Sequence, residues 1–224
     1  MKPIIRTYSI NKYKWKEMIQ DVFECDDLKN IHHLRKDLFP DKNVLSKPWP
    51  LNENTTKFHQ EFYSKLDNDW DDIKNSYELF IKNEIKPLFN EEFLYQKFPT
   101  FRVNLPELKS VNKWHYDSDE NHRHPDGEIN FHIGITDCFD TNAIWVESEP
   151  RKEDFKPINV KYGEFAEFNG NKCTHGNKTN KTEVTRISFD FRVLPISKYK
   201  AGKNKTSVTI NNKFEEGGYY KKYV

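Results

Sequence analysis

The chain of 224 residues lacks the features that mark membrane-spanning, secreted or nucleic-acid-binding proteins. No apolar run approaches the length needed to span a bilayer, and Lys2 and Arg6 are not followed by a hydrophobic signal region. Charge of one sign is also lacking, because 36 Lys and Arg balance 35 Asp and Glu to a net charge of +1. We therefore expect a soluble cytoplasmic protein with no membrane partner and no general attraction to nucleic acid.

Cysteine is scarce as well. Cys25, Cys138 and Cys173 are an odd number at unrelated spacings, which argues against a disulfide framework or a zinc cluster. We expect free thiols, with Cys173 as a small buried residue. Hydrophobic residues make up only 35% of the chain, but 17 Phe, 11 Tyr and 5 Trp can bury large areas, so the core should be aromatic.

The first hundred residues have the apolar spacing of three and four that predicts helices. We expect helices at about 12–23, at 55–66 with Asn54 or Thr55 as the N-cap, and at 70–88, closed by Pro87; these are taken to pack against the outside of a sheet. Three prolines make 40–52 a predicted loop.

From Phe93 onward the apolar period changes to two, which predicts strands. The expected strands lie near 100–105, 113–117, 128–136, 143–148, 157–160, 164–168, 172–175 and 184–193. Eight short strands fit a mainly β, double-stranded β-helix (a cupin-like jelly roll) with flanking helices. We expect one catalytic domain over 1–224, with a mostly helical flank (1–98), a β-helix core (99–194) and a tail (195–224). Part of the tail should dock on the domain through Val208, Ile210, Phe214, Tyr219, Tyr220 and Tyr223.

The segment Trp114-His115-Tyr116-Asp117 and the distant His175 are the strongest chemical signal. In a strand, His115 and Asp117 would point to the same side and could bind one metal ion. Two imidazoles and one carboxylate are the ligands that leave one side of an iron(II) ion open, although zinc could occupy the same set. Taken without His175, the pair is better explained as a surface histidine and an aspartate that begins a turn.

Several further segments accompany these ligands in a fixed order: Pro99–Val103, Gly127–Phe131, Trp145–Pro150 and Ser188–Val193. Together with His115, Asp117, His175 and Arg186, the chain over roughly 55–194 resembles the iron(II)/2-oxoglutarate-dependent dioxygenases, in particular their StrG-like branch. The resemblance implies a double-stranded β-helix with His115, Asp117 and His175 holding Fe(II) at its open end. It also implies 2-oxoglutarate as the cosubstrate.

The strand at 184–193 supplies the expected cosubstrate anchor. Its even-numbered residues face one way, so Arg186 and Ser188 can together bind a carboxylate. The resemblance makes this the distal carboxylate of 2-oxoglutarate and selects Arg186 because it follows His175 by eleven residues. Asn130 is a further expected cosubstrate contact. The alternative is an ion ladder of Arg186, Asp190 and Arg192 without a ligand, and we expect Arg192 to pair with Asp190.

The expected substrate-binding residues rest on strand alternation alone. They are Arg102, Trp145, Glu147 and His132. Each has a structural alternative: Trp145 as core, Arg102 and Glu147 as a buried pair, and His132 as a hydrogen-bonded interior residue. His122 and His124 are interpreted as loop residues.

If the resemblance holds, the protein hydroxylates a small polar metabolite such as a sugar, aminocyclitol, amino acid or nucleotide. Molecular oxygen would be consumed, with succinate and carbon dioxide as coproducts. The retained Asp117 disfavours halogenation, whereas desaturation, ring closure and epimerisation stay open. The alternatives are a non-catalytic ligand-binding jelly roll and a cupin-like metal isomerase, neither of which needs a carboxylate clamp.

Overall fold

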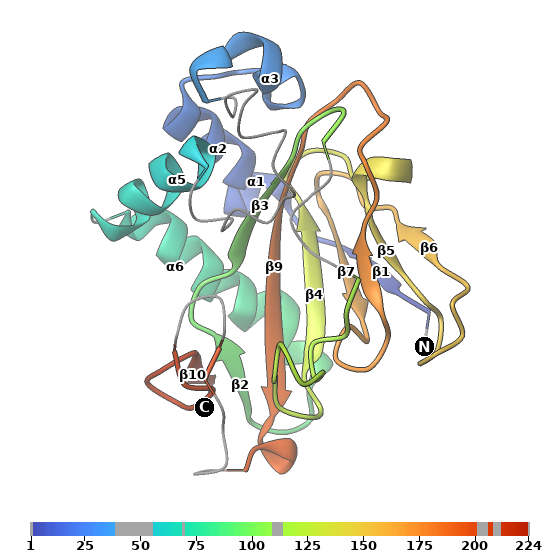
Figure 1. Ribbon diagram of the computed structural model, residues 1–224. Coiled ribbons are helices and arrows are strands. Elements are labelled where there is room, and N and C mark those ends of the chain that lie inside the picture. Colours follow the sequence, from blue (N-terminus) through green and yellow to red (C-terminus); the bar gives the residue numbers. More distant parts are fainter. Residues whose placement is uncertain are drawn as a thin grey trace.

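Two antiparallel sheets form the framework in the computed structural model, which describes residues 2–38, 56–68, 70–108, 114–200, 206–207 and 212–223 (Figure 1). Within those residues the larger sheet has seven strands in the order β1 (Ile4–Thr7), β7 (Glu164–Phe168), β4 (Ile129–Gly134), β9 (Arg186–Pro195), β2 (Phe93–Gln96) and β10 (Tyr220–Tyr223), with β3 (Thr100–Asn104) also paired to β9. The smaller sheet has the order β6 (Lys156–Ile158), β5 (Ile144–Val146) and β8 (His175–Asn177).

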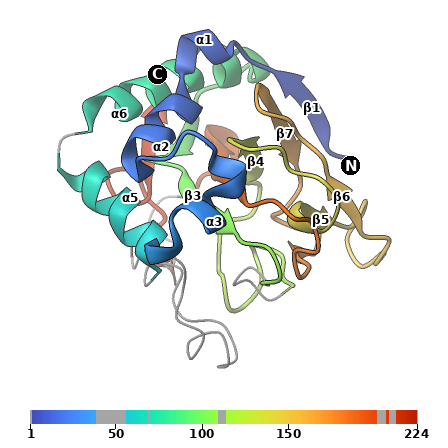
Figure 2. The same cartoon turned by 90° about the horizontal axis from the view of Figure 1, so that it is seen from above.

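The helices gather on one face of the larger sheet, and the smaller sheet lies on its other side (Figures 1 and 2). The α-helices are α1 (Ile10–Tyr13), α2 (Trp15–Phe23), α3 (Ile31–Leu34), α5 (Lys57–Asp67) and α6 (Asp71–Phe80). A π-helical turn covers Ile81–Ile85, and short 3-10 helices cover Leu28–Asn30, Lys36–Leu38, Lys86–Leu88, Asp140–Asn142 and Ile196–Lys198. In the described part of the chain, no helix has the length and apolarity to cross a membrane.

Aromatic side chains join the helices to the larger sheet. Phe62 of α5 stacks on Phe101 of β3 with ring centroids 4.1 Å apart, and Trp15 of α2 meets Phe189 of β9 edge-on at 5.9 Å. All four side chains are buried in one cluster that spans the helices and strands β3, β4, β7 and β9. The expected aromatic core and the packing of helices against the sheet are confirmed. Aromatic pairs of this kind contribute about 0.5–1.5 kcal/mol beyond the area they bury.

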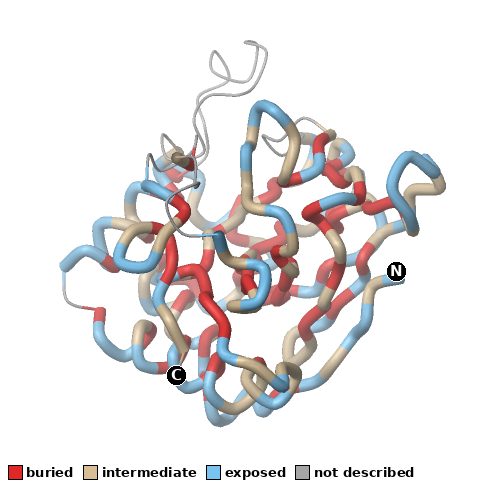
Figure 3. The backbone as a smooth tube through the Cα atoms, turned by 90° about the horizontal axis from the view of Figure 1, so that it is seen from below, coloured by how far each residue is buried: buried red, intermediate tan, exposed pale blue. Residues whose placement is uncertain are grey.

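A second core lies between the two sheets. Ile144 and Val146 of β5 pack with Ala166 and Phe168 of β7 and with Cys173. Figure 3 shows the buried backbone concentrated along the strands, with exposed residues on the helices and loops. Cys25, Cys138 and Cys173 are all free and buried, as expected.

The predicted helices are present with altered ends. Lys14, at φ 49°, divides the predicted helix 12–23 into α1 and α2. The predicted helix 70–88 is α-helical only to Phe80, and α5 is capped by Thr56, whose Oγ1 accepts a hydrogen bond from the His59 backbone N–H at 3.3 Å. The expected caps Asn54 and Thr55 and the predicted loop 40–52 lie outside the described residues.

Seven of the eight predicted strands have counterparts, from β3 to β9. The eighth, at 113–117, is reduced to a single bridge at His115, with residue 113 outside the described residues. Three short strands, β1, β2 and β10, were not expected. Each has only four residues, too few for a clear period-two pattern, and each is defined by its pairing with a distant segment.

The C-terminal segment docks as expected where it is described. Phe214, Tyr219 and Tyr220 are buried against Leu94 of β2 and Leu194 of β9. Tyr223 stacks on Phe93 with centroids 5.3 Å apart. Val208 and Ile210 lie outside the described residues. The docked segment adds β10 to the edge of the larger sheet, beside β2.

His59 should make the unfolding free energy depend on pH. Burial lowers the pKa of this imidazole from 6.5 to about 4, so the unfolded state binds a proton more readily than the folded state. The stability that this group contributes is complete above pH 6.5 and is lost as pH falls toward 4. The unfolding free energy, measured by chemical denaturation, should fall between pH 7 and pH 4.5 by about 2 kcal/mol less in His59→Gln than in the unsubstituted protein. Equal losses in the two proteins would contradict the prediction.

Candidate metal centre

The structure brings together His115, Asp117 and His175, the three ligands predicted from the sequence. Their ligand atoms lie within 4.8 Å of one another, and all three residues are buried. Asp117 Oδ1 is 3.4 Å from His115 Nε2 and 3.7 Å from His175 Nε2. Adjacent ligand atoms at about 2.1 Å from a metal ion are about 3 Å apart, so small side-chain shifts would complete the site.

Local backbone contacts, rather than a continuous strand, place the three ligands. His115 and His175 face each other in an antiparallel bridge with N···O distances of 3.0 and 2.8 Å. The backbone N–H of Asp117 donates to the Gly170 carbonyl at 2.9 Å. Gly176 matters here, because a Cβ at this position would come within 2.9 Å of the Trp114 ring. His115 and Asp117 therefore converge through a turn that is tied to the β8 region.

The imidazole of His175 is oriented for metal binding. Its Nδ1 lies 3.1 Å from the Cys173 carbonyl oxygen, which can only accept a hydrogen bond, so Nδ1 carries the proton. The lone pair is therefore on Nε2, the ring nitrogen that lies on the side of Asp117. Burial, followed by the neighbouring His115, lowers the pKa of His175 to about 4. The ring is therefore neutral at pH 7, which is the form that binds metal ions. These residues fit a divalent metal ion.

Two donors hold the other side of the Asp117 carboxylate. Arg192 donates from Nε to Oδ2 at 2.9 Å and from Nη2 to Oδ1 at 3.3 Å, and Asn130 Nδ2 donates to Oδ2 at 2.6 Å. Burial alone would raise the pKa of Asp117, but the Arg192 guanidinium and the bond from His115 outweigh it. The pKa is held well below its usual range, so the Asp117 carboxylate is anionic.

The predicted pairing of Arg192 with Asp190 is wrong. Asp190 instead accepts from Arg102 Nε at 3.1 Å and from His132 Nδ1 at 2.6 Å. Asp190 and Arg192 share a face of β9, but the neighbouring strand β4 determines their partners. In the register of the two strands, His132 lies opposite Asp190 and Asn130 lies opposite Arg192. The sequence allows two interpretations of His132, as a substrate-binding residue or as a hydrogen-bonded interior residue. With 0% exposure and its bond to Asp190, it matches the second interpretation.

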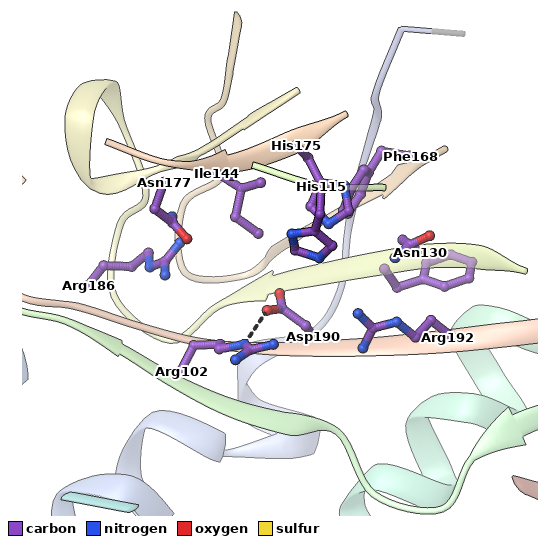
Figure 4. A pocket seen from close by; sticks show the side chains of 12 residues that line it. Arg102, His115, Asn130, Ile144, Phe168, His175, Asn177, Arg186, Asp190 and Arg192 are labelled. Carbon is purple, nitrogen blue, oxygen red and sulfur yellow. Dashed lines mark hydrogen bonds and ion pairs between the residues drawn. The ribbon is translucent and has the colours of Figure 1, made fainter. Parts of the chain in front are cut away.

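A cavity adjoins the ligands and holds the predicted cosubstrate anchor (Figure 4). Arg186 lines it and is 1% exposed, yet its Nε and Nη1 have no hydrogen-bond partner among the described residues. Ser188 is fully buried two residues further along the same strand, and its Oγ likewise has no described partner. The lining also includes Arg102, His115, Asn130, Phe131, Ile144, Phe168, His175, Gly176, Asn177, Asp190 and Arg192.

Trp145 and Glu147, predicted to bind substrate, do not line this cavity. Ile144 lines it instead, so the alternation along β5 is the reverse of the expected one. Trp145 lies under the Lys178 ammonium group, 3.1 Å from its ring centroid. The buried Glu147 accepts from the backbone N–H groups of Thr174 and Glu153 at 2.6 and 3.0 Å. The apolar residues of β5 turn inward because they fill the core between the sheets.

Sequence reasoning missed two contacts beside the metal ligands. The first is the Arg192–Asp117 ion pair. Asn130 and Arg192 are opposite each other on β4 and β9, but this could have indicated the pair only if the register of the two strands had been known. The second is His122, interpreted as a plain loop residue, whose ring stacks on His115 with centroids 3.9 Å apart. Nothing in the sequence marks that stacking.

The fold and site together define a helix-flanked, antiparallel β-sheet protein with a buried two-histidine, one-carboxylate cluster that can hold a metal ion. No protein-family model matches the chain. It is 30% identical over 213 residues to the streptomycin biosynthesis protein StrG of Streptomyces griseus. The aligned region covers 95% of this chain and 94% of StrG. The chain belongs to the same family as StrG.

Solved structures with a more distant likeness include ThoJ and CytC3. The non-heme monooxygenase ThoJ in complex with nickel is 11% identical with a TM-score of 0.46, covering 98% of this chain and 82% of ThoJ. CytC3 with Fe(II) and alpha-ketoglutarate is 15% identical with a TM-score of 0.46, covering 89% of this chain and 83% of CytC3. Similarity at this level decides neither the fold nor the activity of this chain.

Removal of any one ligand should weaken metal binding. His115→Ala, Asp117→Ala and His175→Ala should each reduce Co(II) affinity at least about tenfold in a calorimetric titration, because the loss of a direct ligand should cost no less than the loss of a residue that supports one. The matched control is His33→Ala, which replaces an exposed histidine of α3 and should leave the affinity unchanged. Full affinity in any of the three variants, with far-ultraviolet circular dichroism unchanged, would remove that residue from the site.

Proposed function

We propose that the protein is an iron(II)- and 2-oxoglutarate-dependent dioxygenase built on a double-stranded β-helix. His115, Asp117 and His175 would hold Fe(II), which supplies the oxidising chemistry when bound. The proposal is supported by the buried ligand cluster, by the cavity beside it and by the ordered sequence motifs. Membership of the StrG family is consistent with a role in the biosynthesis of small molecules.

The observation that carries the proposal is the state of Arg186. Two of its three buried guanidinium nitrogens, Nε and Nη1, have no partner among the described residues. This is costly, because desolvated N–H groups lose their hydrogen bonds to water. The other two arginines of the cavity have carboxylate partners, Arg102 with Asp190 and Arg192 with Asp117. The expected alternative, an ion ladder along β9, is therefore absent from the described structure. An anionic ligand in the cavity would complete Arg186, and the distal carboxylate of 2-oxoglutarate suits its two-pronged geometry.

The remaining residues would bind and orient the reactants. Ser188 would add a hydroxyl bond to the same carboxylate, and the Asn130 Oδ1, which has no described partner, would face the cosubstrate. Arg102 and Asn177 give the cavity further polar groups, which suit a small polar substrate. The role of the chain is to hold the cosubstrate and the substrate in reacting geometry, with succinate and carbon dioxide as coproducts.

The competing functions are a non-catalytic ligand-binding jelly roll and a cupin-like metal isomerase. Neither gives a reason for a buried arginine that, among the residues the structure describes, has no anionic partner beside the metal-ligand cluster. Anaerobic addition of Fe(II) and then 2-oxoglutarate, followed by visible absorption of the chelate, tests the proposal directly. No absorption band together with no calorimetric binding of 2-oxoglutarate would reject it. A screen of polar metabolites for stimulated succinate formation would then find the substrate.

Arg186→Leu should separate cosubstrate binding from metal binding. The substitution removes a charge-assisted pair at a buried site, which costs on the order of 2–5 kcal/mol, and about 1.4 kcal/mol corresponds to a factor of ten. The affinity for 2-oxoglutarate in the presence of Mn(II) should therefore fall at least about tenfold in calorimetric titration. Affinity for Mn(II) alone should change little, because Arg186 has no ion pair with Asp117 in the described structure.

The control for this variant is Arg35→Leu. Arg35 pairs with Asp37 and Glu61 in the helical region and does not line the cavity, so both affinities should be retained. An unchanged 2-oxoglutarate affinity in a folded Arg186→Leu protein would show that the cosubstrate carboxylate binds elsewhere.

A further inference from the structure

The two oxygens of the Asp117 carboxylate have different surroundings. Oδ1 faces the imidazoles, 3.4 Å from His115 Nε2 and 3.7 Å from His175 Nε2. Oδ2 accepts two strong bonds, from Asn130 Nδ2 at 2.6 Å and from Arg192 Nε at 2.9 Å. Asp117 is 1% exposed, so water does not compete for Oδ2. Oδ1 also accepts a longer bond from Arg192 Nη2, at 3.3 Å. Oδ1 is thus the oxygen turned toward the two imidazoles, while Oδ2 accepts the two shorter bonds from protein donors.

The larger sheet fixes both donors rigidly. Asn130 of β4 and Arg192 of β9 are direct cross-strand neighbours, and both side chains come from the face that lines the cavity (Figure 4). A loop donor could follow a carboxylate that rotates toward a metal ion, whereas paired strands in the middle of a sheet cannot. The donors therefore define a fixed orientation of the carboxylate.

Close packing holds Asn130 in place. A Cβ on Gly170 would lie 2.7 Å from Asn130 Nδ2, so only glycine leaves room for this amide. The Gly170 carbonyl also accepts the backbone N–H of Asp117 at 2.9 Å. The same residue thus positions the ligand and makes space for one of the donors that orients it.

The C-terminal segment supports the other donor. Tyr219 is buried, which raises the pKa of its hydroxyl, and the neighbouring Arg192 guanidinium offsets part of that rise. The Tyr219 hydroxyl donates to Gln96 Oε1 at 2.8 Å, which links the segment to β2. Arg192 thus interacts both with Asp117 and with Tyr219 of the docked C-terminal segment.

We propose that Asn130 and Arg192 are positioning residues that restrict Asp117 to binding the metal ion through Oδ1 alone. The proposal rests on the metal site of the proposed function and deepens it. A carboxylate bound through both oxygens would occupy an additional coordination position. With Oδ2 withheld, a six-coordinate ion keeps three positions for exogenous ligands. A cosubstrate that chelates through two oxygens would take two of these positions, and one further ligand would take the third.

A purely structural role predicts something different. If Arg192 and Asn130 only neutralise and solvate a buried carboxylate, their removal changes stability and leaves the coordination mode as it was. The test therefore measures the coordination itself, with Mn(II) as the probe and without 2-oxoglutarate, so that it does not depend on turnover or on cosubstrate binding.

Crystals of the protein soaked with Mn(II) give the Asp117–metal distances, and water-proton relaxation in solution reports the number of waters on the ion. The unsubstituted protein should show Oδ1 bound and Oδ2 outside bonding distance. In Asn130→Ala, and more fully in Asn130→Ala/Arg192→Met, Oδ2 should move onto the ion. The number of bound waters should then fall by about a third, from three to two. Asn180→Ala removes a similarly buried asparagine whose side chain donates to the Asn104 and Val184 carbonyls and accepts from Thr182. It has no hydrogen bond to Asp117 among the described residues, so this variant should keep the wild-type coordination.

Each outcome decides the matter. Binding of Mn(II) through both oxygens in the unsubstituted protein would overturn the proposal. One-oxygen binding retained in the double variant would also overturn it, as would one-oxygen binding retained in Asn130→Ala if the double variant does not fold. Because Asn130→Ala keeps the Arg192–Asp117 ion pair, it should fold even if the double variant does not. One-oxygen binding in the unsubstituted protein with no affinity for 2-oxoglutarate would support the positioning role while rejecting the proposed dioxygenase.

Discussion

The buried ion pair between Asp117 and Arg192 is the interaction on which the rest of the site depends. It joins the 114–128 segment, which has little regular structure of its own, to the long central strand β9. Removing one member of such a pair leaves an uncompensated buried charge and costs about 3–5 kcal/mol. Asp117 in turn lies beside both imidazoles, so the ion pair determines where the three ligands meet.

The strands that carry the site are rigid because their opposite face is aromatic. On β4 and β9, Phe131 and Phe191 stack with ring centroids 5.0 Å apart, directly across from each other in the register. Phe189, two residues before Phe191 on the same face of β9, packs against Trp15 and Phe62 of the helices. The polar face of the same strands is thereby held in position by close packing, which resists even small displacements. A poor hydrophobic content is compensated by large aromatic residues placed where the site needs support.

The polar face of β9 could be predicted from the sequence because it follows from alternation along one strand. The grouping of His115, Asp117 and His175 was predicted from the order of the motifs and their resemblance to a known family, and the structure brings the three residues together. Partner choice did not follow, since the pairing of Arg192 with Asp117 depends on the register of β4 against β9 and on the path of a loop. The reversed alternation at Trp145 has a similar origin: a strand of three residues can place either face inward, and packing between the sheets selected Ile144. The edge strands β1 and β10 become strands only through their partners.

Charge pairing within the cavity explains why Arg186 stands apart from its neighbours. Arg102 and Arg192 are each completed by a carboxylate of the protein, and those two pairs are compatible with a closed, stable interior. Arg186 is equally buried but has no ion-pair partner among the described residues, and Ser188 beside it has a hydroxyl without a described partner. Local violations of hydrogen-bond satisfaction are expected where a protein binds ligands, because the ligand supplies the missing groups. The same polar face of β9 thus carries two buried arginines in different states: Arg192 is paired with Asp117, whereas Arg186 has no ion-pair partner among the described residues.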